Sequence, residues 1–215
     1  MAGYVNCDLF PAPGIDAVFD LMQPWPFEDG SCDGAYASHV LEHMPNCFTF
    51  FREAWRVLDD KRLLRLRLPY GGHRSAWTDP THLRPWWPES FAFLQPGDDE
   101  AVHNPQHDAW DSPFLVAYVG VRVSRWVRET CRWRWAFHAM ARWLSQVPDA
   151  LEELWVDVYA LKSPASVAWC RANVQANAVP VRLVMYGHDW ELGGWEPGQA
   201  LRVVDVTTRD IVAAF

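Results

Sequence analysis

Gly34-Ala-Tyr-Ala-Ser38 begins the stretch of sequence that decides the fold. Apolar residues then recur at helical spacing from Phe48 to Leu58, and Leu63-Leu-Arg-Leu-Arg-Leu68 partly alternates before Pro69. A strand, a helix of about a dozen residues and a second strand are typical of βαβ units. The sequence therefore predicts an α/β fold with a mainly parallel sheet.

The residues on either side of this stretch extend the pattern. Two short strands are expected upstream, over residues 4–8 and 17–21, each with an acid at or near its end. Residues 70–113 are rich in Gly, Pro, His and Trp and predict a long irregular segment, of the kind that often forms a functional lid. Further strands and helices are expected downstream: strands over 115–123, 154–161, 181–186 and 201–206, and helices over 125–144 and 165–178.

Composition excludes several classes of function. Half of the 215 residues are apolar, and the net charge of −8 argues against a non-specific nucleic-acid coat or a binder of anionic membranes. No apolar run approaches the ~20 residues of a membrane span, and no secretory signal is visible at the start. Five scattered cysteines form no CxxC pair, so a reducing, cytoplasmic setting is expected.

Four stretches carry a resemblance to a known family. These are Gly3-Tyr-Val-Asn-Cys-Asp8, Asp16-Ala-Val-Phe-Asp-Leu21, Pro26-Phe-Glu-Asp-Gly-Ser-Cys-Asp33 and Ala37-Ser-His-Val-Leu-Glu-His43. Together with Arg52–Leu58 and Glu152–Pro164, they resemble class I S-adenosylmethionine-dependent methyltransferases over roughly residues 1–164. The most specific part is the run from Pro26 to Leu58. The resemblance implies a Rossmann-like sheet, with residues 165–215 as a C-terminal α/β extension.

The resemblance also implies a set of cofactor contacts. Ligands of open α/β sheets bind at the carboxyl ends of the strands. Asp8 then accepts hydrogen bonds from the ribose hydroxyls of S-adenosylmethionine, and Asp20 approaches the adenine amino group. Leu21 or Phe27 covers the adenine face, and Ser38 lies near the methionine part of the cofactor. The alternative for each polar residue is a side chain that caps its own loop.

The acceptor side of the site is expected around two histidines, His39 and His82. His39 follows the third strand, and His82 lies in the segment 71–88, the best candidate for a lid over the methyl acceptor. A histidine near neutral pKa serves as a general base. The alternative is that His82 and Arg84 only hold this loop in place by hydrogen bonds.

The pattern departs from the family at two points. The family's first strand and Gly-rich turn have no counterpart before Gly3, and Leu58-Asp-Asp-Lys-Arg-Leu63 replaces a Pro-Gly-Gly-type turn. Three explanations stay open for the first departure. The protein is a degenerate, inactive methyltransferase-like fold; or it is a partial gene product; or the tail, through 181–186 or 201–206, fills the vacant strand position beside Asp8.

A rival motif occupies the same residues. His39-Val-Leu-Glu-His43 matches the H-x-x-E-H pattern of inverted zinc peptidases, in which two histidines on one helical face bind zinc and Glu42 acts as base. His73, Asp79 and His82 would then be candidates for a third ligand. The residues before His39 indicate a strand and not a helix, and the methyltransferase pattern explains the same five positions, so no metal site is expected.

Two functions follow from these residues. The first is methyl transfer from S-adenosylmethionine to an unknown acceptor. The second is a catalytically inactive methyltransferase-like module, acting as a structural or interaction subunit of a homo-oligomer or larger protein assembly. The absence of the Gly-rich turn and the 14 tryptophans favour the second function, whereas Asp8, Asp20 and the His39–His43 run favour the first. Neither function calls for a membrane or a nucleic acid.

Overall fold

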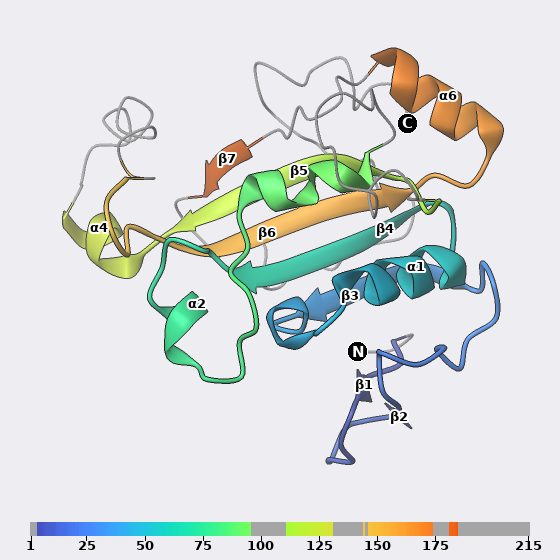
Figure 1. Ribbon diagram of the computed structural model, residues 1–215, viewed down its shortest axis with the longest axis horizontal. Coiled ribbons are helices and arrows are strands. Elements are labelled where there is room, and N and C mark those ends of the chain that lie inside the picture. The colour runs from blue at the N-terminus through green and yellow to red at the C-terminus, as the bar shows by residue number, and fades with distance from the viewer. Residues whose placement is uncertain (1–3, 96–110, 131–143, 145, 174–180, 185–215) are drawn as a thin grey trace.

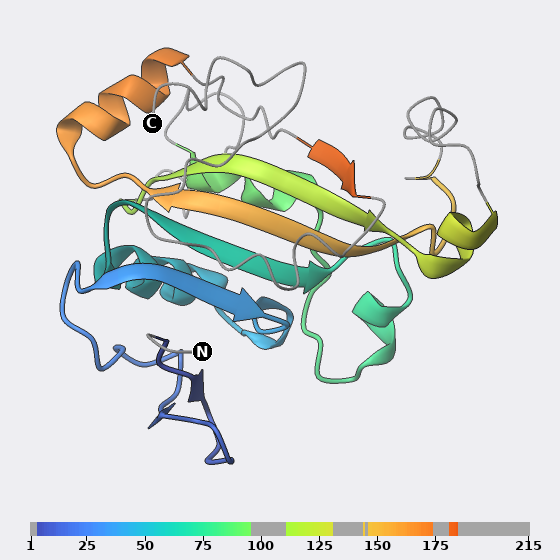
Figure 2. The same ribbon diagram turned by 180° about the vertical axis from the view of Figure 1, so that it is seen from behind.

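A five-stranded sheet forms the centre of the computed structural model, which describes residues 4–95, 111–130, 144, 146–173 and 181–184. The order of strands is β3-β4-β6-β5-β7 (Figures 1 and 2). Their bounds are β3 Cys32–Ser38, β4 Leu58–Pro69, β5 Phe114–Val123, β6 Leu151–Ala160 and β7 Val181–Val184. The predicted α/β class is confirmed.

One strand of this sheet runs against the others. β3 pairs with β4 in parallel and β5 pairs with β7 in parallel, whereas β6 lies antiparallel between β4 and β5. The sheet is therefore mixed: four of its five strands share one direction, but two of its four pairings are antiparallel, so the expected mainly parallel sheet is only partly found. The antiparallel insertion of β6 was not readable from the sequence, because strand direction depends on partners distant in the chain.

Helix α1, Cys47–Val57, covers one face of the sheet together with the 3-10 helix η2, Pro88–Leu94 (Figure 1). Asn46 caps α1, because its side chain accepts a hydrogen bond from the backbone N–H of Phe48 at 3.0 Å. Five residues of α1 recur at helical spacing and are buried: Cys47, Phe50, Phe51, Ala54 and Val57. They pack with the sheet into a single large apolar core.

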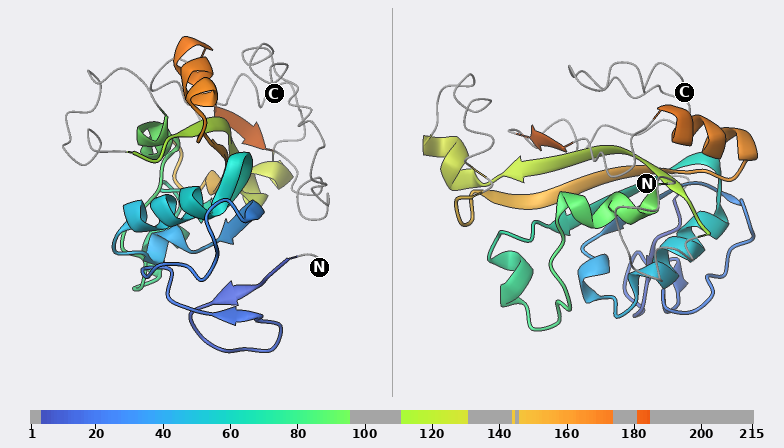
Figure 3. Two further views of the ribbon diagram at one scale, coloured as in Figure 1. Left: turned by 90° about the vertical axis from the view of Figure 1, so that its right-hand side faces the viewer. Right: turned by 45° about the horizontal axis from the view of Figure 1, so that its top comes forward.

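The first two strands are short and stand apart from the main sheet. β1, Cys7–Asp8, pairs in parallel with β2, Ala17–Val18, and no other described strand joins this two-stranded ladder (Figure 3, left). The expected strand over 17–21 stops early, because Phe19, Leu21 and Met22 instead pack against the core. Sequence patterning overestimated both strands.

The tail does not fill the strand position beside Asp8, at least where the structure describes it. β7 pairs with β5, at the edge of the sheet opposite β3, so that explanation is wrong for Val181–Val184. The other candidate, 201–206, lies outside the described residues, as do residues 185 and 186 of the first. Helix α6, Pro164–Asn173, begins where the extension was expected to begin. A domain boundary at residue 164 stays a prediction.

The other expected elements are partly described. The irregular segment 70–113 contains the short helix α2, Ser75–Thr78, besides η2, and residues 96–110 are outside the description. Of the helix expected over 125–144, the structure describes α4, Arg125–Thr130. In the described part of the chain, no helix is both long and apolar enough to cross a membrane.

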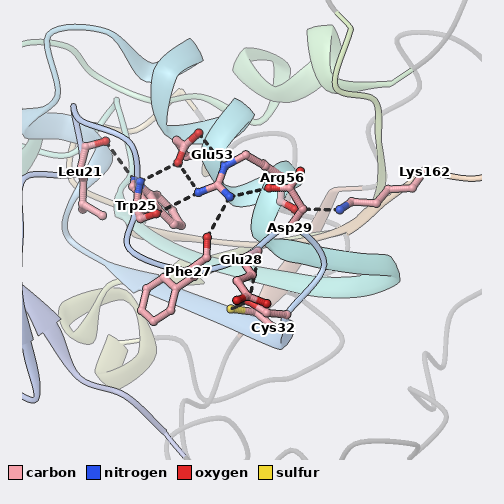
Figure 4. A network of polar contacts seen from close by, with 10 residues as sticks. Leu21, Trp25, Phe27, Glu28, Asp29, Cys32, Glu53, Arg56 and Lys162 are labelled. Carbon is pink, nitrogen blue, oxygen red and sulfur yellow. Dashed lines mark hydrogen bonds and ion pairs between the residues drawn. The ribbon is translucent and has the colours of Figure 1, made fainter.

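Arg56 anchors the loop before β3 to helix α1 (Figure 4). Its guanidinium donates to the backbone carbonyls of Trp25 and Phe27 at 3.0 and 2.8 Å. It also donates to the carboxylates of Glu53 and Asp29, at distances between 2.6 and 3.0 Å. Glu53 accepts in addition from the backbone N–H of Trp25 at 2.7 Å. A single side chain thus fixes the path of the loop that leads into β3.

Replacement of Arg56 by methionine should lower the free energy of unfolding by about 2 kcal/mol, because the backbone carbonyls of Trp25 and Phe27 and the carboxylate of Glu53 lose their donor together. Urea denaturation followed by circular dichroism measures the change. The control is Arg125→Met, which breaks an exposed ion pair with Glu129 on α4 and should change stability by less than about 0.5 kcal/mol. Equal effects of both variants would contradict the anchoring role of Arg56.

Glu53 makes the stability of this region dependent on acid. The hydrogen bond from Arg56 holds the pKa of Glu53 below its ordinary value of 4.5. The stabilisation is therefore complete above that value and is lost as the pH falls through the lower pKa of the folded state. Unfolding measured between neutral and acid pH should show a shallower loss of stability for Glu53→Gln than for wild type. The control Glu28→Gln, an exposed acid in the same loop, should behave as wild type; an unchanged slope in Glu53→Gln would refute the assignment.

Candidate functional site

The carboxyl end of β3 opens the candidate site. Ser38 is the last residue of the strand, and His39 follows it with a φ of 54°, in the left-handed region that few side chains adopt. This turn leads at once into the 3-10 helix η1, Leu41–His43. In open α/β sheets, ligands bind beyond the carboxyl ends of the strands, so a ligand site is expected where β3 and β4 end.

Positively charged side chains converge on Glu153 at this edge. Because β6 is antiparallel, its beginning lies beside the carboxyl ends of β4 and β5. Glu153 Oε1 accepts from His39 Nε2 at 3.1 Å and from Arg67 Nε at 2.5 Å. Its Oε2 accepts from Trp155 Nε1 at 2.9 Å and lies 3.3 Å from Arg122 NH1. The side chain of Glu153 is only 4% exposed, so these contacts form in a largely dry setting.

The contacts within this cluster shift the pKa values of Glu153 and His39. Burial acts to raise the pKa of Glu153, but hydrogen bonds from His39 and Arg67 and the charge of Arg122 outweigh it, so this pKa lies below its ordinary value. Hydrogen bonds to Glu153 and Glu42 raise the pKa of His39 to about 9. His39 is therefore protonated at neutral pH and offers hydrogen-bond donors and not a base.

His82 and His43 meet next to this cluster. Their rings contact edge to face, with centroids 4.7 Å apart. The backbone N–H of Leu83 donates to the carbonyl of Glu42 at 2.7 Å, which ties the loop after α2 to η1. The structure thus brings His39 and His82, the two histidines expected on the acceptor side, into one region, connected through Glu42 and His43.

The helical arrangement required by an H-x-x-E-H peptidase is absent from the described structure around His39. His39 follows the last residue of β3, and Leu41–His43 form a single 3-10 turn, so His39 and His43 do not share one face of a helix. The sequence reading that placed these residues at a strand end was correct. Arg84, weighed as a loop-holding residue, does donate to the Pro45 carbonyl at 2.7 Å.

Asp8 and Asp20 both cap their own loops. Asp8 Oδ1 accepts from the backbone N–H of Phe10 at 3.0 Å, and Asp20 Oδ1 accepts from that of Met22 at 2.8 Å. Both residues are exposed and lie toward the same end of the β1–β2 ladder. Within the described residues, no hydrogen bond or ion pair joins either acid to His39 or His82.

Leu21 and Phe27 are half-buried and pack against the core. Phe27 contacts the ring of Phe19 edge to face at 5.8 Å, and the Leu21 carbonyl accepts from Trp25 Nε1 at 3.2 Å. Ser38 is also half-buried, next to His39. The structure therefore separates the expected site residues into two groups, one around β1 and β2 and one at the carboxyl end of β3.

Glu153 and Glu42 are the polar residues that sequence reasoning missed. Arg65 and Arg67 alternate on one strand, which signals acidic partners across the sheet, and Asp157 indeed holds Arg65 with two hydrogen bonds of 2.8 Å. The register between β4 and β6, which places Glu153 beside Arg67, depends on residues far apart in the chain and cannot be predicted from either strand alone. Glu42 was noticed only as part of a peptidase motif.

One segment of the chain matches a known protein family. Residues 10–64 match the family described as a methyltransferase domain. This segment contains Asp20, Leu21, Phe27, Ser38 and His39 and extends into β4. Over these residues the chain is methyltransferase-like. The resemblance read from the sequence is confirmed over this stretch. A search of curated proteins found no match.

Several solved structures of low sequence identity are similar to part of this chain. A SAM-dependent methyltransferase from Archaeoglobus fulgidus is 12% identical with a TM-score of 0.43, over 68% of each chain. YcgJ of Bacillus subtilis is 13% identical with a TM-score of 0.40, over 69% of this chain and 73% of YcgJ. The [4+2]-cyclase SpnF is 18% identical with a TM-score of 0.42; the match covers 69% of this chain but only 58% of SpnF. Likeness at this level assigns no residue roles.

Loss of the Glu153 charge should destabilise the methyltransferase-like fold strongly. Glu153→Gln leaves Arg67, Arg122 and His39 without their shared anion, and breaking such a buried cluster costs about 3 kcal/mol. Chemical denaturation measures the difference. The matched control is the neighbouring Glu152→Gln, whose carboxylate is 20% exposed and should cost less than about 1 kcal/mol. A Glu153→Gln variant as stable as wild type would show that the cluster does not hold the strands.

Proposed function

We propose that this protein binds S-adenosylmethionine and transfers its methyl group to an acceptor. The observation that carries the proposal is the methyltransferase-domain match over residues 10–64, which ends inside β4. The matched segment delivers Ser38 and His39 to the carboxyl edge of the sheet, where ligands of such folds bind. The cofactor itself supplies the activated methyl group on a sulfonium.

We assign cofactor binding to the group of residues around β1, β2 and the start of the site. Asp8 would accept from the ribose hydroxyls and Asp20 would approach the adenine amino group. Each carboxylate uses Oδ1 for its own loop, so Oδ2 stays available as an acceptor. Leu21 and Phe27 would cover the adenine face, and Ser38 would lie beside the methionine part.

We assign the acceptor side to His39 and His82. His39 carries a proton at neutral pH, and because its two ring nitrogens face Glu42 and Glu153, it would act on the acceptor side through its position and charge. His82 directs Nδ1 toward the Ala76 carbonyl at 3.3 Å, so its Nε2 keeps a lone pair that can receive a proton or bind an electrophile. The two residues thus have different chemistry although they lie in one region.

The alternative function, an inactive structural or interaction module, is favoured by one observation. Asp8 and Asp20 already serve as loop caps, which is the role expected of acids that bind no ligand. A homo-oligomer or a larger assembly would then be the context of the protein. A cytoplasmic location stays a prediction from cysteine usage.

Calorimetric titration of the purified chain with S-adenosylmethionine and S-adenosylhomocysteine separates the two functions. Binding with a micromolar dissociation constant is expected for a working site. Asp8→Ala should weaken it at least about tenfold, because one charge-assisted hydrogen bond is worth about 1.5 kcal/mol or more. Asp8→Asn keeps the loop cap but weakens the acceptor, so it distinguishes loss of the loop from loss of the ribose contact.

The control for this titration is Asp33→Ala, which removes an exposed acid near the start of β3, at the end opposite Ser38; Asp33 pairs with Arg62 of β4. It should bind as wild type does. Absence of binding by a chain that circular dichroism shows to be folded would refute methyl transfer and leave the structural module.

A further inference from the structure

Glu42, His43 and His82 gather where η1 meets the loop after α2. One ligand-type atom of each residue lies within 4.8 Å of those of the other two. We propose that these three side chains form a binding site for one divalent transition-metal ion, with Zn²⁺ as the best match. The site goes beyond methyl transfer and does not depend on it, because cation binding is measured without S-adenosylmethionine.

The carboxylate of Glu42 is the observation that points to a cation. Its side chain is 1% exposed, and Oε1 contacts His39 Nδ1 at 3.2 Å. Oε2 is buried and has no hydrogen-bond partner among the described residues. A buried carboxylate is costly unless it is paired or coordinates a metal. Oε2 is therefore a ligand atom without a partner.

The two histidines are held with one nitrogen free. Thr81 Oγ1 donates to Asp79 Oδ1 at 2.6 Å, so it accepts from His43 Nδ1–H at 3.0 Å. The Ala76 carbonyl can only accept, so the 3.3 Å contact with His82 also places the proton on Nδ1. In both rings Nε2 then carries the lone pair. Metal-binding histidines usually donate their other N–H in this way, to a carbonyl or a carboxylate chain.

The donor set selects the class of metal. Two imidazole nitrogens and one carboxylate oxygen suit Zn²⁺, whereas Ca²⁺ and Mg²⁺ prefer oxygen ligands alone. Bonds of about 2.0 Å in a tetrahedral site place neighbouring ligand atoms about 3.3 Å apart. The three ligand atoms now lie within 4.8 Å of one another, so a metal ion would draw them closer together. The 2.7 Å backbone hydrogen bond from Leu83 to Glu42 already holds the two segments in place. Three protein ligands leave the fourth position open.

This set differs from the peptidase motif by one histidine, and Glu42 is a ligand here and not a base. His39 is excluded as a ligand, since Glu153 engages its Nε2 and Glu42 its Nδ1. His82 replaces it from a distant loop, forty residues beyond Glu42 in sequence numbering. Asp79 Oδ2, at 3.9 Å from His82 Nε2, adds negative charge beside the site.

Zn²⁺ titration of the full chain by calorimetry, after treatment with a chelator, tests the site. We expect one Zn²⁺ per chain and, with Co²⁺ in its place, the visible absorption bands of a tetrahedral N/O site. His82→Ala should weaken Zn²⁺ binding at least about a hundredfold, since loss of an outer partner alone costs 10- to 100-fold. Thr81→Val, on the exposed surface, should weaken it about tenfold, because His43 Nδ1 loses its hydroxyl partner and keeps the Thr81 carbonyl at 3.3 Å.

The matched control is His73→Ala, a histidine of the same segment whose Nδ1 contacts Ser75 Oγ at 2.7 Å. It should bind Zn²⁺ as wild type does. If His82→Ala fails to fold by circular dichroism, Thr81→Val decides alone. No binding by wild type, or equal affinity in wild type and Thr81→Val together with folded His82→Ala, would overturn the proposal. A loss shared by His73→Ala would also overturn it, because the metal would then lie elsewhere.

Discussion

The shared carboxylate of Glu153 ties together the strands on which the candidate site is built. Positive groups reach it from the turn after β3 (His39), from β4 (Arg67) and from β5 (Arg122). Each cation alone would be costly to hold at a partly dry sheet edge, and the anion alone would be costly as well. Together they fix the relative positions of strand ends that are far apart in the chain. Trp155 adds to this order, because Arg67 stacks on its ring at 5.1 Å while its indole N–H binds Glu153.

The same edge explains how one sheet can serve two chemistries. His39 is charged by its two acidic neighbours and acts as a donor, whereas His43 and His82 are fixed by neutral acceptors with a lone pair exposed to a ligand. Residues of one type thus acquire opposite properties within a short distance. The difference comes from second partners: carboxylates for His39, a hydroxyl and carbonyls for the other two.

Much of the fold was predictable because it is encoded locally. Apolar spacing between Phe48 and Leu58 predicted α1 to within a residue, and the alternation before Pro69 predicted β4, although β4 begins earlier, at Leu58. The candidate site was less accessible. His39 and His82 were expected in one region, but Glu153 and Glu42 acquire their roles only from the antiparallel register of β6 and from the loop contact at Leu83. Neither depends on a periodic pattern. The short β1 and β2 were overestimated because core packing, and not strand pairing, captures Phe19 and Leu21.

The position of β6 has a consequence for the order of folding. Leu63 pairs with Tyr159 and Leu68 with Leu154, so the centre of the sheet joins segments that are nearly a hundred residues apart. Such contacts form slowly, because a long loop must close before they can contribute. During synthesis, β3, α1 and β4 emerge well before β6. Until then Arg65 and Arg67 lack their acidic partners, Asp157 and Glu153. Until residues 151–160 are made, β4 has an unpaired edge, and in this interval the chain is most exposed to pairing with other chains.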